Sequence, residues 1–400
     1  MNRLFVGLYS GPSALGVDAA LVRVHGVGAD ITFNLEHFLH VPYSPDLRAL
    51  VRRAAGTGAV DVRTLGTLHR ALGENYALAV RQLLEQARQA APATWAIGCS
   101  GQTIWHDADG RFPAALDLGM TAVLAERTGL TAVADFASRD LALGGQGSPL
   151  SAIVVSRLFR HARECRAHLH LGSIASLVYL PANERLLGFE AAPATMLLDG
   201  LMHLLTNGRE PFDAGGKHAV QGRCLDPLLE RWMQNHFLQQ RPPKCVPRHE
   251  YGADFLLRAI DQAKRLDGTL HDTLCTMTHF VARSVAHAVH AYLPAAPMRI
   301  LLSGRGVRNG LLWHLLEQRL QPIVVEKTDA HGVPAEAVHA VAHAGLAALT
   351  LDGVPTNLPS VTGASGQRVL GQVAPGSSAN WSRCLAWMAR MSEPARALAA

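Results

Sequence analysis

The sequence lacks the features that mark several common classes of protein. Its six cysteines lie far apart and form no C-x-x-C pair, which argues against a disulfide framework or a cysteine zinc site and fits reduced thiols in the cytoplasm. No stretch approaches about 18 consecutive apolar residues, so we expect no membrane-spanning segment. Lysine and arginine are scattered and are not interleaved with aromatic residues. We therefore expect no nucleic-acid partner, although a net charge of +5 would suit an anionic small ligand.

Metal-binding patterns are missing as well. The chain has 20 histidines, but it contains no H-E-x-x-H or comparable spacing with carboxylates. We predict no metal site and interpret the histidines as surface or satisfied core residues. Charged residues make up only 17% of the chain, which argues against long disordered tails. The 400 residues, 48% of them hydrophobic, suffice for the cores of two or three domains.

The chain opens with two apolar, strand-like runs between Leu4 and Val24, separated by a turn that contains Gly11, Pro12 and Gly16. Because glycine has no Cβ, a ligand can approach the backbone N–H groups of such a turn closely. Actin-like and sugar-kinase ATPases present a phosphate loop in this way. Most glycine turns, however, join ordinary hairpins.

A second copy of this pattern begins near Ala167. Strand-like residues flank Gly172 and Ser173, and a third predicted strand ends at Glu190. The repetition predicts two related α/β domains, and a phosphate chain would then lie between the two turns.

A third glycine turn, Ser303–Gly310, follows a strand predicted from Met298. Asn309 is placed to cap the helix that follows. A glycine turn between a strand and a helix can lie flat against a nucleotide base or phosphate, so this turn is a further candidate for nucleotide contact.

Hydrophobic periodicity predicts helices over 65–84, 121–128, 270–293 and 334–349, and strands over 94–99 and 131–135. Two polar segments, Ser100–Asp107 and Asp135–Leu150, follow these strands, where open α/β sheets commonly bind substrates. A plain turn explains the first segment equally well. An Asp–Arg pair that holds a glycine-rich crossover is the alternative for the second.

These motifs together resemble the anhydro-N-acetylmuramic acid kinase family. The similarity runs nearly from end to end, and its order and spacing make chance agreement implausible. The segments that carry it are GLYSG, GVDAALV, SGQTIWH, VADF, SRD, GGQG, LGFE, TDAHGVPAEAV and NLPSVTGA.

The resemblance implies an α/β fold with two actin-like, ribonuclease H-like domains around a central nucleotide cleft. We expect domain I over 1–130, completed by 368–400, and a nucleotide-binding domain II over 131–367. The implied activity is ATP-dependent hydrolytic opening of a 1,6-anhydro sugar with phosphorylation of O6, in cell-wall sugar recycling. ATP and Mg²⁺ are the implied cofactors, the anhydro-sugar is the implied partner molecule, and a homodimer is suggested.

The resemblance also implies roles for individual residues. Glu190 aligns with the carboxylate that activates water. The expected nucleotide-binding residues are Gly11, Pro12, Ser13, Gly16, Asp18, Gly172, Gly304, Gly306 and Asn309. The expected substrate-binding residues are Gln102, Thr103, Asp135, Arg139 and Asp140.

Departures from the family pattern fall where the chemistry is expected. Pro12, in place of Thr, lacks a backbone N–H and a hydroxyl. Glu190, in place of Asp, is longer by one methylene, and a displacement of about 1 Å can cost on the order of a hundredfold in rate. Ala192 and Ala194 replace glycines, and we expect their methyls to crowd a phosphate cradle. Other departures are Leu15, Ser100, Met120, His170, Ser173, Ser176, Thr195 and His339.

Three functions therefore stay open from sequence. The first is the anhydro-sugar kinase itself. The second is a catalytically impaired paralogue, a pseudokinase that binds a sugar or a protein partner. The third is phosphoryl transfer redirected to another sugar.

Overall fold

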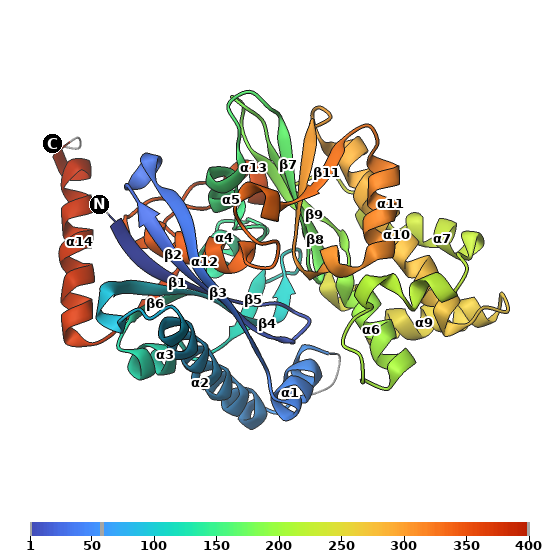
Figure 1. Cartoon of the computed structure of the whole chain (residues 1–400), viewed down its shortest axis with the longest axis horizontal. Coiled ribbons are helices and arrows are strands. Elements are labelled where there is room, and N and C mark those ends of the chain that lie inside the picture. Colours follow the sequence, from blue (N-terminus) through green and yellow to red (C-terminus); the bar gives the residue numbers. More distant parts are fainter. Residues whose placement is uncertain (1, 57–59, 398–400) are drawn as a thin grey trace. The chain divides into compact units, whose positions relative to one another are not determined.

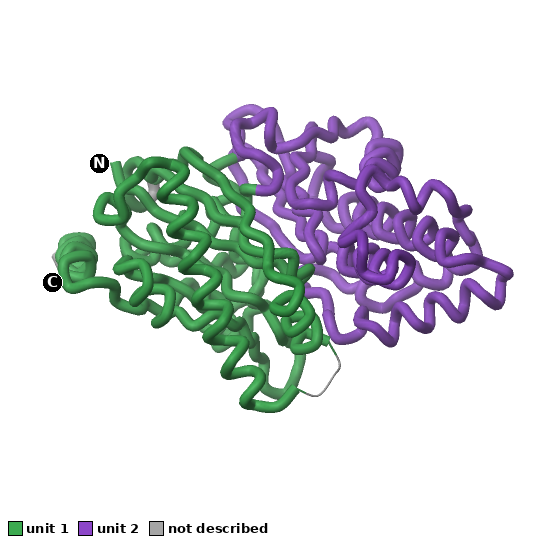
Figure 2. The backbone as a smooth tube through the Cα atoms, turned by 60° about the horizontal axis from the view of Figure 1, so that its bottom comes forward, with its two compact units in different colours: residues 1–158, 337–400 green, residues 159–336 purple. Residues whose placement is uncertain are grey.

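The computed structural model describes residues 2–56 and 60–397. The chain forms two compact units: unit 1 comprises residues 1–158 and 337–400, and unit 2 comprises residues 159–336 (Figure 2). Unit 1 is discontinuous, because the chain leaves it for unit 2 and then returns.

Unit 1 contains a seven-stranded sheet (Figure 1). Its strands are β1 (Asn2–Ser10), β2 (Gly16–His25), β3 (Thr32–Pro42), β4 (Thr94–Asp107), β5 (Ala114–Leu118), β6 (Thr131–Ala134) and β12 (Gln372–Ala374). Strands β1, β2 and β3 form an antiparallel meander, β4 joins β1 in parallel and β6 joins β4 in parallel. Its helices are α1 (Pro45–Ala55), α2 (Val62–Gln86), α3 (Thr121–Thr128), α4 (Ser138–Leu141), α5 (Ala152–Phe159), α12 (Val338–Leu351), α13 (Pro359–Thr362) and α14 (Ser378–Ala397).

Unit 2 contains a five-stranded sheet. Its strands are β7 (Arg166–Leu171), β8 (Ile174–Leu180), β9 (Leu187–Pro193), β10 (Arg299–Ser303) and β11 (Val324–Lys327). Strands β7, β8 and β9 form a meander, β10 joins β7 in parallel and β11 joins β10 in parallel. Its helices are α6 (Thr195–Thr206), α7 (Asp226–Met233), α8 (His236–Gln239), α9 (Ala253–Lys264), α10 (Leu270–Tyr292) and α11 (Gly310–Leu320).

Five strands of the unit 1 sheet repeat the strand order of the unit 2 sheet. In each, an antiparallel meander of three strands is extended by two parallel strands on the side of its first strand. This is the ribonuclease H-like order of actin-like proteins, so the predicted α/β class and the duplicated hairpin are confirmed.

Strand β1 supplies both faces of the unit 1 sheet. Leu4, Val6 and Leu8 belong to the core cluster that includes the buried face of α2. Gly7 points the other way, because successive strand residues alternate between faces, and there it meets α12. Helices α2 and α12 therefore pack against opposite faces of the sheet.

One element differs from the sequence-based expectation. Strand β4 continues to Asp107 instead of ending at Cys99, because β5 pairs with its second half. Ser100–Asp107 is therefore strand and not a turn.

The unit boundaries also differ from the expected limits at 130 and 367. Strand β6 pairs with β4, which keeps residues 131–134 in the first sheet. Helix α12 packs on β1 and β4, which returns the chain to unit 1 from residue 337. Periodicity within a segment does not reveal such long-range pairing.

Replacement of Gly7 by alanine should destabilise unit 1 strongly. A Cβ at Gly7 would lie 1.8 Å from the carbonyl oxygen of Ala340 in α12, so the helix would have to move. We expect a loss of about 3 kcal/mol, the upper end of overpacking costs, and a melting temperature lower by several degrees. The matched control is Gly66→Ala in α2, where nothing lies within 4 Å. Because alanine favours helix there, G66A should melt no lower than wild type. Equal melting temperatures for G7A and G66A would contradict the packing.

Candidate functional site

The first glycine turn joins β1 to β2 in unit 1. The Ala14 N–H donates to the carbonyl of Gly11 at 3.0 Å, so the turn closes without the N–H that Pro12 lacks. Gly16 has φ of 156°, and a Cβ there would lie 2.2 Å from the carbonyl oxygen of Val41. Glycine at position 16 is therefore required by backbone packing. Pro12 and Ser13 are half-buried on the turn.

A buried polar network supports this turn from the sheet side. The hydroxyl of Ser10 lies 2.6 Å from the hydroxyl of Tyr43 and 2.6 Å from Oε1 of Gln102. The amide of Gln102 donates to the carbonyl of Gly11 at 3.2 Å, and Ser100 accepts from the N–H of Ser10. Burial raises the pKa of Tyr43, which keeps its phenol neutral. Gln102 thus holds the turn through its own side chain.

Asp18 lies on β2, two residues beyond the turn. Its Oδ1 is 2.7 Å from Nδ1 of His40 on β3, and the Asp18 residue is buried. The structure therefore gives Asp18 a histidine partner that the sequence pattern did not indicate.

The expected substrate loop is anchored by Asp140. This fully buried carboxylate accepts hydrogen bonds from Asn357 at 3.0 Å, from Thr362 at 2.8 Å and from the N–H of Gly147 at 2.9 Å. Asp140 therefore ties the Asp135–Leu150 segment to residues 357–362. The sequence left two roles for this segment, substrate binding or a crossover held by an Asp–Arg pair. For Asp140 the structure favours the second role, but its partners are Asn357 and Thr362 and not an arginine.

The other expected substrate residues lie nearer the surface of unit 1. Asp135 has φ of 52° and accepts from the N–H of Ser138, at the start of α4. Arg139 donates to the carbonyl of Val369 at 2.8 Å. Thr103 is half-buried on β4.

In unit 2, the second hairpin turn is fastened to the start of α6. The carbonyl of Gly172 accepts from the N–H of Thr195 at 3.0 Å, and the carbonyl of Ser173 accepts from those of Ala194 and Met196. The first N–H groups of α6 are therefore already hydrogen-bonded by the hairpin.

The expectation that the methyls of Ala192 and Ala194 crowd a phosphate cradle is wrong. Both are fully buried in the main core cluster of unit 2. Ala194 has φ of −132°, outside the left-handed region that favours glycine. Their methyls pack in the core instead of crowding an open cradle.

Two histidines share one serine beside the glycine turns. Nε2 of His168 and Nδ1 of His170 lie 2.8 Å and 2.9 Å from the hydroxyl of Ser303. Burial, with the neighbouring His168, lowers the pKa of His170 to about 3, so its imidazole is neutral at physiological pH. A Cβ on Gly172 would lie 2.7 Å from Nε2 of His170, and one on Gly304 would lie 2.9 Å from its Cε1. The imidazole therefore lies against both turns.

The turn after β10 is closely packed. A Cβ on Gly306 would lie 2.7 Å from Cβ of Leu171, so glycine at 306 allows the two segments to meet. Asn309 accepts from the N–H of Leu312 at 3.0 Å and caps α11. The predicted cap is confirmed.

Glu190 lies on β9 and is only 3% exposed. Its Oε2 accepts from the N–H of Val246 at 2.8 Å, and a guanidinium nitrogen of Arg248 lies 3.8 Å from Oε1. The backbone N–H of Glu190 donates to the carbonyl of Lys244 at 3.1 Å. The segment 244–248 thus orients the carboxylate, and no sequence motif indicated Val246 or Arg248.

Lys244 fixes that segment. Its buried ammonium donates to the carbonyl of Phe237 at 3.1 Å and lies 4.5 Å from the ring centroids of Phe237 and Tyr292. Burial lowers the pKa of Lys244 to about 8. A cation held by aromatic rings in this way anchors the backbone that contacts Glu190.

Within residues 2–56 and 60–397, no three His, Cys, Asp or Glu side chains are grouped so that they could hold a metal ion. In the same part of the chain, no helix is both long and apolar enough to span a bilayer. The candidate residues described above lie partly in unit 1 and partly in unit 2.

Comparison with known proteins places the chain in a family. The family described as anhydro-N-acetylmuramic acid kinase matches residues 3–376. A protein of that name from Salinibacter ruber is 37% identical over 384 residues, which cover 93% of this chain and 96% of the relative. One from Nitrosomonas europaea is 35% identical over 371 residues and covers 93% of this chain and 99% of the relative.

Among solved structures, the activator of 2-hydroxyisocaproyl-CoA dehydratase from Clostridium difficile with bound ADPNP matches with a TM-score of 0.40 at 11% identity. The match covers 86% of this chain and 93% of that one, and a likeness at this level carries no functional information. The family match and the similarity to the relatives both extend over nearly the whole length. The chain belongs to the anhydro-N-acetylmuramic acid kinase family.

Proposed function

We propose that this protein opens the 1,6-anhydro ring of anhydro-N-acetylmuramic acid by hydrolysis and transfers the γ-phosphoryl group of ATP to the freed O6. One observation carries the proposal: relatives named for this kinase activity are similar to 93% of the chain, and the family match over residues 3–376 spans all the candidate site residues. A cytoplasmic location and a homodimer stay predictions.

Glu190 is proposed as the base that activates the attacking water. A base must be held at a fixed position relative to the proton that it removes. Val246 and Arg248 provide this orientation, since one donates to Oε2 and the other faces Oε1. Glu190 would take a proton from the water as the water oxygen bonds to the anomeric carbon and the bond from that carbon to O6 breaks. O6 would then attack the γ-phosphorus, the bond from that phosphorus to the bridging oxygen would break, and ADP would leave.

The nucleotide is proposed to contact Gly11, Pro12, Ser13, Gly16 and Asp18 of the first turn, and Gly172, Gly304, Gly306 and Asn309 of unit 2. Magnesium in such reactions is bound mainly by phosphate oxygens and waters, with one or two carboxylates. The described residues contain no preformed three-ligand cluster, which is compatible with Mg²⁺ arriving with ATP.

The sugar is proposed to contact Thr103, Asp135 and Arg139. For Gln102 and Asp140 we propose a supporting role in addition, because their side chains hold the first turn and the 135–150 segment. A ligand would then meet surfaces shaped by these two residues.

Replacement of Glu190 by glutamine should abolish most of the activity. We expect kcat to fall on the order of a hundredfold or more, the range of general-base contributions, whereas Glu190→Asp should retain turnover because it keeps the carboxylate. The assay is ADP release with Mg-ATP that depends on the anhydro-sugar, together with identification of the 6-phosphorylated product.

The matched control is Glu317→Gln on the exposed side of α11, which should behave as wild type. Wild-type turnover by E190Q would remove Glu190 from the mechanism. An inactive wild-type protein that still binds the sugar would reject the kinase and support a pseudokinase. Turnover of a different sugar alone would support redirected transfer.

Replacement of Arg248 by methionine should lower kcat while the KM for the anhydro-sugar changes little. The side chain faces Glu190 at 3.8 Å, so its loss disturbs the orientation of the base. We expect a fall of about tenfold, with partial recovery in Arg248→Lys, since misplaced catalytic groups lose rate steeply. Arg258→Met, an exposed change on α9, is the control. A change in KM alone would assign Arg248 to substrate binding.

A further inference from the structure

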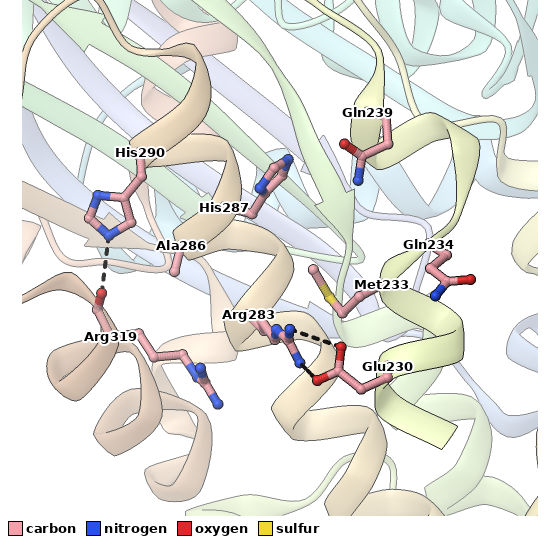
Figure 3. A pocket seen from close by; sticks show the side chains of 9 residues that line it. All are labelled: Glu230, Met233, Gln234, Gln239, Arg283, Ala286, His287, His290 and Arg319. Carbon is pink, nitrogen blue, oxygen red and sulfur yellow. Dashed lines mark hydrogen bonds and ion pairs between the residues drawn. The ribbon is translucent and has the colours of Figure 1, made fainter. Parts of the chain in front are cut away.

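A cavity of about 510 Å³ opens among helices of unit 2 (Figure 3). Its lining comes from α7, α8, α10 and the last turn of α11, where Arg319 lies. At 1.5 Å per residue, Arg319 is about 15 Å along the helix from Asn309, which caps the other end. The cavity is therefore distinct from the glycine turns, and its volume is typical of small-molecule sites.

Arg319 gives this cavity its net positive charge. The other lining arginine, Arg283, is neutralised by Glu230, because its guanidinium makes two contacts with that carboxylate. No described carboxylate pairs with Arg319, and its buried Nε has no hydrogen-bond partner within the described chain. Because Arg319 lines the cavity and has no acidic partner among the described residues, an anionic, oxygen-bearing ligand would offset its charge.

Two histidines of α10 also line the cavity. Nε2 of His290 donates to the backbone carbonyl of Arg319 at 3.2 Å, which holds the ring at the end of α11 (Figure 3). His287 bonds to the backbone of Leu238, while its buried Nε2 has no partner within the described residues. Burial is the main cause that lowers the pKa of His287, and Lys244 lowers it further. The pKa of His279, a residue outside the lining, is likewise lowered mainly by burial and less by Arg319.

The remaining lining is uncharged and consists of two amides, Gln234 and Gln239, and two apolar side chains, Met233 and Ala286. The amides can donate to and accept from hydroxyl groups. A ligand that satisfies the polar part of the lining needs an oxyanion for Arg319 and hydroxyls for the amides. A cation would be repelled by Arg319, and a purely apolar ligand would leave the amides unpaired.

We propose that this cavity binds a small hydroxylated anion, a sugar that carries a phosphate or a carboxylate, with Arg319 as its principal contact. The site is separate from the kinase site proposed above and does not depend on it.

Direct binding of glucose 6-phosphate, glucuronate and glucose by calorimetry at constant ionic strength tests the site. We expect saturable binding of one or both anions, and at least tenfold weaker binding of neutral glucose. Arg319→Gln should weaken anion binding by about tenfold or more, because hydrogen bonds to charged groups are the strong ones. Arg319→Lys should lose less, since it keeps the charge.

The matched control is Arg258→Gln, an exposed arginine outside the cavity, which should bind as wild type. Because a sugar anion could also enter the kinase site, E190Q serves as a second control and should bind as wild type here. Equal affinity of wild type and R319Q, equal affinity for glucose, or no saturable binding would overturn the proposal. Melting curves of each variant verify that folding is intact.

Discussion

The direct packing of α12 on the backbone of β1 and β4 is the constraint on which unit 1 depends. Gly7 and Gly98 lie where the helix crosses the two strands, and any side chain there would meet the carbonyls of Ala340 and His343. The close approach matters for the site, because β1 leads into the first glycine turn and β4 carries Gln102, four residues beyond Gly98. A small displacement of the helix would thus be transmitted to the residues that hold the turn.

The far end of the same helix is fixed by charge. Asp352, just beyond α12, forms a buried pair with Arg3 at the start of β1, and Nε1 of Trp387 donates to the same carboxylate. Burial of two charges costs solvation, so such a pair contributes more to a defined geometry than to net stability. Together, the glycines and the ion pair set the position of α12 along β1. They also explain why residues from 337 onward belong with the start of the chain.

The sequence predicted those features that are determined locally. The helix over 121–128 and the cap at Asn309 follow from short-range periodicity and side-chain chemistry, and both are confirmed. The hairpins follow from apolar runs around glycine turns. The environment of Glu190 could not be predicted, because Val246 and Arg248 are 56 and 58 residues away along the chain and reach it only through tertiary folding. The extent of β4 was missed for a similar reason, since its second half is strand only because β5 pairs with it.

The departures from the family pattern are compatible with the fold for reasons that differ from position to position. Pro12 is accommodated because the turn is closed by the N–H of Ala14. Ala192 and Ala194 are accommodated because their methyls join the core. His170 is accommodated because Nδ1 of its imidazole is hydrogen-bonded to the hydroxyl of Ser303, so this buried nitrogen has a partner. Each of these substitutions is thus accommodated by contacts within its own unit: a turn closed by another N–H, methyls that join the core, and an imidazole that finds a hydroxyl. None of them requires the duplicated scaffold to change its geometry.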